Sequence, residues 1–170
     1  MILETSRLLL REMTWDDYPA ICEILQDAQT MCAYEHAFSD DEAKQWMEKN
    51  FARYEKDGFG LWAVSLKDTG RVIGQCGLTT QHTPTGDMVE IGYLFNRAFW
   101  GSGYAIEAAR GCKKYAFEVL KLPVVCSIIR ESNLSSRNVA EKNGMRVAGE
   151  WLKHYYGIDM PHYIFSVKRK

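Results

Sequence analysis

The sequence predicts an α/β fold of the α+β kind, with helices flanking a mixed, mostly antiparallel sheet. In the middle of the chain, three strand-like runs follow one another across short turn sequences, which favours antiparallel neighbours. A helix, a strand and a second helix come next, and this order is typical of a crossover between parallel strands. A length of 170 residues indicates one domain, residues 1–170.

Composition narrows the classes of function. The formal net charge is −1 and the isoelectric point is about 6.4, so no broad basic face is expected and nucleic acid is not an expected partner. There is no long apolar segment, so neither secretion nor a membrane partner is expected. The five cysteines are scattered without a Cys-x-x-Cys pair, which favours reduced thiols in the cytoplasm over disulfides or a metal site.

The first third of the chain predicts a strand and two helices. Residues 8–13 form the strand, and Thr14 then caps a helix that reaches about Gln26. The run Ser-Asp-Asp-Glu starting at Ser39 begins the second helix, and Gly58 ends it.

Turn sequences delimit the strands in the middle of the chain. Residues 61–66 and 71–78 form a hairpin around Lys-Asp-Thr-Gly. A second turn at residues 81–87 contains Pro and Gly and leads into a central strand at residues 90–96.

Two glycines separate this central strand from an amphipathic helix. Gly101-Ser102-Gly103 lets the backbone turn sharply, and the first amides of the helix after it have no internal acceptor. Such amides suit a phosphate group. A plain strand-to-helix connection explains a lone Gly-x-Gly equally well.

The last third predicts a strand at residues 124–129, a helix from near Ser135 to Gly144, and a final strand pair. The pair comprises residues 145–152 and 163–168, with residues 154–162 as the loop between them.

Dinucleotide binding is the competing interpretation of the glycine turn. The third glycine position holds Ile106, and the acid Glu131 follows later than the usual ~20 residues. Too few strand-helix units follow for a doubly wound sheet, and no Gly-Lys-Ser/Thr phosphate motif is present.

Three motifs together resemble the Gcn5-related N-acetyltransferase (GNAT) superfamily. They are Trp-Gly-Ser-Gly-Tyr-Ala from Trp100, Asn-x-x-Ser from Asn133 and Glu-Lys-Asn-Gly-Met from Glu141. The opening Glu-Thr-Ser-Arg-Leu-Leu-Leu-Arg from Glu4 resembles the branch with the ribosomal-protein N-terminal alanine and serine acetyltransferases. The resemblance covers nearly the whole chain.

The resemblance implies that acetyl-CoA, the acetyl donor, lies where strands 90–96 and 124–129 splay apart. The residues it implies for coenzyme binding are Leu94, Phe95, Gly101, Ser102, Gly103, Tyr104, Ala105, Asn133 and Ser136. The alternative for Asn133 is to cap the helix after it, and the two roles are compatible. Where the family often has Gln or Arg, this chain has Trp100, which affects the contacts at the adenine end.

The resemblance also implies the catalytic groups. Glu90 matches an acid that often serves the family as general base, usually through water, and an exposed strand-end carboxylate or a salt-bridge partner is the equally weighted alternative. The Phe95 backbone N–H matches the donor to the oxyanion. Many relatives have a tyrosine where this chain has Ala140, so Ser136 or water is left to support the departing thiolate.

The expected acceptor is a primary amine, on a protein N-terminus or on a small molecule. Candidate acceptor residues come from two loops and are Tyr34, Glu35, His36, His154, Tyr155, Tyr156 and Asp159. The sequence leaves open whether the protein forms a homodimer. The alternative function is that of a noncatalytic coenzyme-A-binding regulatory or interaction protein.

Overall fold

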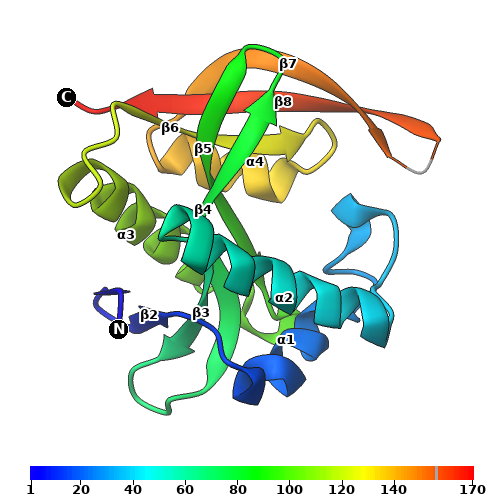
Figure 1. The fold of residues 1–170 in the computed structure, drawn as a ribbon, viewed down its shortest axis with the longest axis vertical. Helices are drawn as coiled ribbons and strands as arrows, with labels where there is room; N and C mark the ends of the chain where they lie inside the picture. The colour runs from blue at the N-terminus through cyan, green and yellow to red at the C-terminus, as the bar shows by residue number, and fades with distance from the viewer. Residues whose placement is uncertain (156) are drawn as a thin grey trace.

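A computed structural model describes residues 1–155 and 157–170. Within these residues eight strands form one sheet in the order β1-β2-β3-β4-β5-β6-β8-β7, as Figure 1 shows. The strands are β1 (Leu3–Glu4), β2 (Leu8–Arg11), β3 (Leu61–Leu66), β4 (Val72–Thr83), β5 (Gly86–Phe95), β6 (Val124–Arg130), β7 (Arg146–Tyr155) and β8 (Ile158–Lys168). The α-helices are α1 (Tyr18–Leu25), α2 (Asp40–Asp57), α3 (Tyr104–Glu118) and α4 (Leu134–Lys142).

The predicted mixed, mostly antiparallel sheet is confirmed. Among the described strands, β5 and β6 are the parallel neighbours, and the other neighbouring pairs are antiparallel. The register between β5 and β6 joins Glu90 with Cys126 alone. The two strands therefore pair only at this point, and their ribbons run in different directions beyond it (Figure 1).

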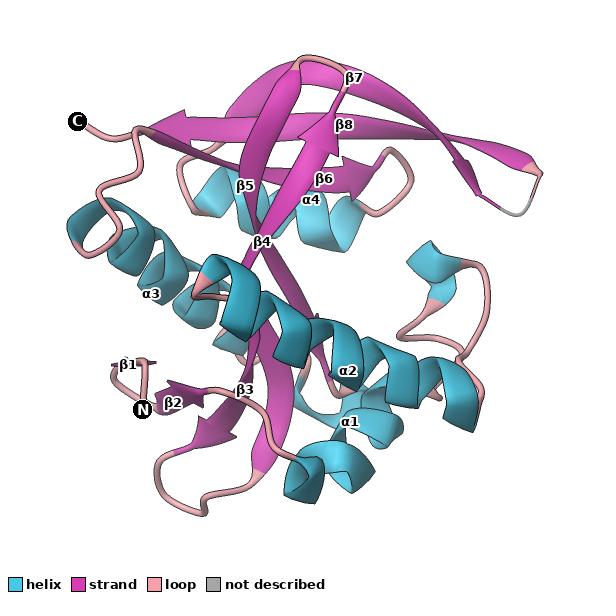
Figure 2. Cartoon of the chain, viewed as in Figure 1, coloured by secondary structure: helices cyan, strands magenta, loops and turns pink. Residues whose placement is uncertain are grey.

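Helices cover both faces of the sheet, and each face has its own apolar cluster. Alanines of α3 and α4 pack with Trp62 and Phe165 on one face. Residues of α1 and α2 pack with Leu61 and Ala63 on the other, where α2 crosses in front of the sheet (Figure 2). Cys112 and Cys126 are fully buried, in agreement with their apolar positions in the sequence. No described helix is both long and apolar enough to cross a lipid bilayer.

The start of α2 follows the prediction. Ser39 Oγ accepts a hydrogen bond from Glu42 N at 3.2 Å, and Glu42 Oε2 accepts one from Ser39 N at 2.8 Å. This reciprocal pair satisfies two amides that the helix itself leaves without acceptors. The helix ends before Gly58, as expected.

The helix predicted from Thr14 begins later than expected. Trp15–Asp17 is a 3-10 turn, and α1 starts at Tyr18. The Asp17 carboxylate accepts from Thr14 N at 2.9 Å and from the Arg11 guanidinium, which fixes a separate turn ahead of the helix. The proline at position 19 then occupies the first turn of α1, where its missing N–H costs nothing.

The predicted loop at residues 154–162 is wrong, because most of it belongs to a long hairpin. Strands β7 and β8 pair as far as Tyr155 and Ile158. Met160 and His162 are buried within β8, so burial and pairing override residue types that are common in loops. The turn predicted at residues 81–87 is likewise shorter, because β4 runs to Thr83 and β5 starts at Gly86.

Candidate active site

Two side chains hold the gap between β5 and β6 at its closed end. Glu90 Oε1 accepts a hydrogen bond from Ile128 N at 3.1 Å, and Ser127 Oγ donates to Ile91 O at 2.8 Å. A backbone group that loses its ladder partner inside a protein needs another one. The Glu90 and Ser127 side chains supply these partners for Ile128 N and Ile91 O, so they allow the two strands to separate here.

Backbone groups of β5 point into the gap beyond this closed end. Asn96 N donates to Ile73 O at 2.9 Å, on the side of β4. Because ladder bonds alternate along a strand, the N–H and C=O groups of Tyr93 and Phe95 point the other way, toward β6. Such a strand edge can pair with an extended ligand.

The Phe95 carbonyl in this edge already has a partner. Trp100 Nε1 donates to Phe95 O at 2.8 Å, while about half of the Trp100 residue remains exposed. The indole N–H thus makes a polar contact at the position where the resemblance leads one to expect Gln or Arg.

The side chains of Leu94 and Phe95 lie on opposite faces of the sheet. Leu94 packs against the cluster of α1 and α2, and Phe95 against the cluster of α3. The Phe95 ring fills the space over Gly74, where a Cβ would lie 2.5 Å from it. Phe95 therefore meets the gap with its backbone, and its side chain belongs to the core.

The glycine turn before α3 has the backbone conformation that its residues predict. Gly101 and Gly103 have φ of +78° and +79°, values that L side chains rarely adopt. A Cβ at Gly101 would meet nothing within 4 Å, so the turn presents its backbone openly. The free amides and the positive end of the α3 dipole make this turn suitable for a diphosphate.

Arg7, from the turn between β1 and β2, braces this site and was missed in the sequence. Its Nη1 donates to Ser102 O at 3.0 Å, and its Nε lies 2.7 Å from Glu107 Oε2. The guanidinium also lies over the ring of Tyr104, 4.3 Å from the centroid. Nothing local in the sequence predicts contacts between positions this far apart.

Asn133 and Ser136 meet at the start of α4. Asn133 Oδ1 accepts from Ser136 N at 3.1 Å, which confirms the predicted cap. The Tyr93 hydroxyl donates to Ser136 O at 2.9 Å from across the gap, and burial strongly raises the pKa of Tyr93. Tyr93 therefore reaches α4 from β5, whereas position 140 on α4 itself holds a buried alanine.

Glu90 lies inside β5 and is partly buried, unlike the exposed strand-end carboxylate of the alternative interpretation. Burial raises its pKa, and this effect outweighs the hydrogen bond from Ile128 and the cations Lys153 and Arg53. Thr79 Oγ1 lies 3.5 Å from Glu90 Oε2. A carboxylate with a raised pKa is better suited to general-base chemistry than an ordinary glutamate.

The early acceptor candidates lie on the α2 side of the sheet. The Tyr34 ring packs edge-on against Trp46, with ring centroids 5.9 Å apart. Glu35 forms an ion pair with Arg130 at the end of β6. His36 Nε2 contacts Glu42 Oε1 at 2.8 Å.

The late acceptor candidates lie along the β7–β8 hairpin. His154 and Asp159 are cross-strand neighbours joined by an exposed ion pair. Lys153 interacts with Glu90, and side chains alternate along a strand, so His154 belongs to the face turned away from Glu90. Tyr156 and the Tyr155 side chain lie outside the described residues.

Comparison with known proteins identifies the family. Residues 7–146 match the model of the acetyltransferase (GNAT) domain. The chain belongs to the GNAT acetyltransferases. It is 31% identical over 170 residues to the uncharacterized N-acetyltransferase YnaD of Bacillus subtilis, covering 92% of this chain and 95% of YnaD.

Solved structures agree with this assignment. The GNAT-family acetyltransferase of Bacillus anthracis superposes with a TM-score of 0.84 and 26% identity, over 99% of this chain and 98% of that one. The ribosomal L7/L12 α-N-protein acetyltransferase RimL, in complex with coenzyme A, has the same fold, with a TM-score of 0.79 and 15% identity over 98% of this chain and 97% of RimL. The dinucleotide interpretation is wrong, because this sheet is not doubly wound.

The gap of this N-acetyltransferase has features that fit acetyl-CoA, the acetyl donor of the family. An exposed strand edge suits the two amides of a pantetheine arm, and the open glycine turn suits the diphosphate. The two features lie at the same end of β5, since the turn follows β5 after one short 3-10 segment, Arg97–Phe99.

Proposed function

We propose that this N-acetyltransferase transfers an acetyl group to a primary amine by direct attack of the amine on the thioester of acetyl-CoA. The observation that carries the proposal is the gap between β5 and β6, held open by Glu90 and Ser127 and leading to the glycine turn before α3. When bound, acetyl-CoA supplies the acetyl group, and its C–S bond breaks as the C–N bond to the amine forms.

Different residues along the gap would bind different parts of the coenzyme. The Tyr93 N–H and C=O would pair with the pantetheine, next to the Leu94 side chain, and Phe95 would meet the coenzyme at the thioester with its N–H. The amides of Gly101, Ser102, Gly103, Tyr104 and Ala105 would hold the diphosphate, with Arg7 bracing their turn. Asn133 caps α4 and thereby fixes Ser136 beside the thioester sulfur.

The chain's own groups handle the protons and the charge. Glu90 takes the proton of the acceptor ammonium, directly or through water, because only the neutral amine is a nucleophile. The Phe95 N–H faces the gap and donates to the developing oxyanion. The Ser136 hydroxyl or a water molecule donates a proton to the leaving thiolate, and the second proton that the nitrogen loses on becoming an amide replaces it. Tyr93 holds the Ser136 carbonyl and so positions this turn of α4.

The acceptor is a protein N-terminus or a small-molecule amine, and we place the reaction in the cytoplasm, in keeping with the five free cysteines. We treat residues 1–170 as one acetyltransferase domain. A noncatalytic coenzyme-A-binding protein is the alternative.

A panel of peptides and small amines, incubated with acetyl-CoA, tests the proposal. We expect acetylated product by mass spectrometry, with one coenzyme thiol released per product. Tight coenzyme binding without product across peptides, amino acids, aminoglycosides and polyamines would contradict catalysis and favour the noncatalytic alternative.

A further inference from the structure

Two of the cations on helix α2, Lys49 and Arg53, lie one helical turn apart on the same side. Within residues 1–155 and 157–170, Arg53 makes one hydrogen bond, from Nη1 to Asn50 Oδ1 at 3.3 Å, and neither cation forms an ion pair with a carboxylate. Like charges at this spacing repel each other, so the pair does not stabilise the helix.

Hydrogen bonds of α2 place Arg53 over the Glu90 end of β5. The Asn50 side chain that contacts Arg53 also accepts from Leu61 N at 3.1 Å. Leu61 of β3 pairs with Gly77 of β4, which in turn pairs with Gly92 of β5, so Leu61 and Gly92 lie at the same level of the sheet. Gly92 is two residues from Glu90, so both lie on the same face of the sheet.

Burial and neighbouring charges shift the pKa values of both cations at this corner. Burial lowers the pKa of Arg53, and burial together with Arg53 lowers the pKa of Lys49. The nearby acids are Glu90, which bonds Ile128 N, and Asp57, which influences Arg53 without forming an ion pair with it. Lys153 adds a further cation beside Glu90.

An aromatic wall borders the same corner. Tyr34 interacts electrostatically with Arg53 and packs on Trp46, which lies one turn ahead of Lys49 on α2. The corner thus combines a base candidate, an aromatic wall and two cations that form no ion pair with a carboxylate of the described chain.

We infer that Arg53, with Lys49 beside it, binds a carboxylate of the acceptor, so that the preferred acceptor is a primary amine that also carries a nearby carboxylate. This rests on the proposed transfer to an amine near Glu90. The cations also favour loss of the proton from the acceptor ammonium and repel polycations. The chemistry selects acidic peptide N-termini and amino acids over polyamines.

Binding of matched peptides to the enzyme saturated with coenzyme A tests this inference without requiring turnover. The probes are three tripeptide amides with an N-terminal serine and Glu, Gln or Lys in second place. By calorimetry we expect the Glu peptide to bind about 10-fold more tightly than the Gln peptide, and the Lys peptide to bind most weakly. Arg53→Gln should abolish the preference for Glu, and Lys49→Gln should reduce it.

Lys44→Gln is the matched control, since Lys44 is an exposed cation elsewhere on α2. It should leave the preference unchanged, and the melting temperatures should show that all three variants fold. Equal binding of the three peptides, or a preference kept in Arg53→Gln, would overturn the inference. Selective binding without acetylated product would support the inference and count against the proposed reaction. A failure of the inference can therefore be told apart from a failure of the proposed acetyl transfer.

Discussion

Glu90 joins the architecture of the gap to its chemistry. Its carboxylate replaces a missing ladder acceptor for Ile128 N, and burial raises its pKa. A carboxylate whose pKa is raised in the folded state weakens folding as pH rises from its unfolded value, near ~4.3, through its folded value. Raised pKa values of this kind are common at catalytic groups, and in Glu90 the shift accompanies a structural bond to Ile128 N.

Glu90→Gln separates these roles, because the amide oxygen can still accept from Ile128 N. We expect turnover to fall by ~10²-fold or more, since general-base assistance is lost. Coenzyme affinity should persist, and the melting temperature at pH 7 should match or exceed that of the wild type. Higher pH should partly restore the rate, because more acceptor is already neutral.

Initial rates and melting temperatures measured from pH 5 to pH 9 check this expectation. If chemistry limits the rate and the variant keeps wild-type turnover throughout, the proton leaves by another route.

The roles of some single residues can be predicted from the sequence, and the roles of others cannot. Asn133 is predictable as a cap, because its side chain bonds an amide three positions away. Arg7, Tyr93 and Arg53 were missed, because their roles depend on contacts with distant segments or on the absence of a partner. Alternation along β5 could have placed Tyr93 on the α4 face.

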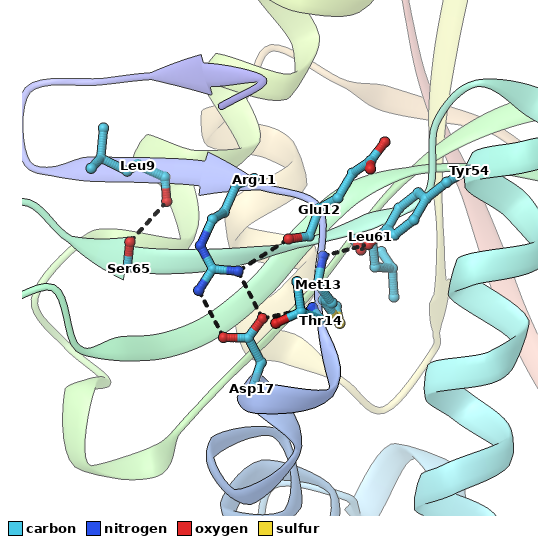
Figure 3. A network of polar contacts seen from close by, with 9 residues as sticks. All are labelled: Leu9, Arg11, Glu12, Met13, Thr14, Asp17, Tyr54, Leu61 and Ser65. Carbon is cyan, nitrogen blue, oxygen red and sulfur yellow. Dashed lines mark hydrogen bonds and ion pairs between the residues drawn. The ribbon is translucent and has the colours of Figure 1, made fainter.

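At the scale of elements, the junction between β2 and α1 is held by the network in Figure 3. Both Arg11 terminal nitrogens lie 2.7 Å from oxygens of the buried Asp17 carboxylate. Tyr54 of α2 accepts from Met13 N at 3.2 Å and donates to Leu61 O. Burial raises the pKa of Asp17, but bonds from Arg11 and Thr14 outweigh it and hold the pKa below its usual value.

Asp17→Asn should destabilise the fold by ~1–3 kcal/mol at pH 7, because a buried charge-assisted network loses its negative charge and one of its two acceptor oxygens. The wild-type advantage is complete above the unfolded pKa of about 3.9 and is lost as pH falls through the lower folded value. Urea denaturation at pH 7 and pH 3 compares the full advantage with the advantage after it has begun to fall. Asp16→Asn, at an exposed neighbour, should behave as wild type at both, whereas equal stabilities for Asp17→Asn and wild type at pH 7 would contradict this account.

Local rules predict some element boundaries and fail at others. The capping box and the glycine set the limits of α2, because both signals act within one helical turn. The length of the β7–β8 hairpin was missed, since His162 and Pro161 resemble loop residues until cross-strand pairing places them in β8. Thr14 does precede a helical turn, but that turn is the 3-10 segment Trp15–Asp17, because the Asp17 carboxylate bonds Thr14 N and Arg11 and α1 starts only after it.

At the scale of the whole molecule, the order of elements predicts a mixed sheet, and the GNAT resemblance predicts where it splays. No local pattern marks that point, because Glu90 and Ser127 lie 37 positions apart and act across two strands. The acceptor is the least predictable part, since the charged side chains that act on Glu90 come from α2 and β7, which are far from β5 in the sequence.

The central claim is that acetyl-CoA lies in this gap with its diphosphate at the turn before α3. Calorimetric titration of Gly101→Asp with acetyl-CoA tests it, because a side chain there meets no protein atom within 4 Å. Gly70→Asp is the matched control: Gly70 also has positive φ, +69°, and open space, but lies in the turn between β3 and β4. A Gly103 variant is less clean, since Arg7 Nη2 would lie 3.5 Å from its Cβ.

Both variants should lose similar stability from backbone strain. The account predicts that Gly101→Asp binds acetyl-CoA ~10-fold or more weakly than wild type, because its carboxylate faces the diphosphate, while Gly70→Asp keeps wild-type affinity. A folded Gly101→Asp variant with wild-type affinity for acetyl-CoA would contradict the claim.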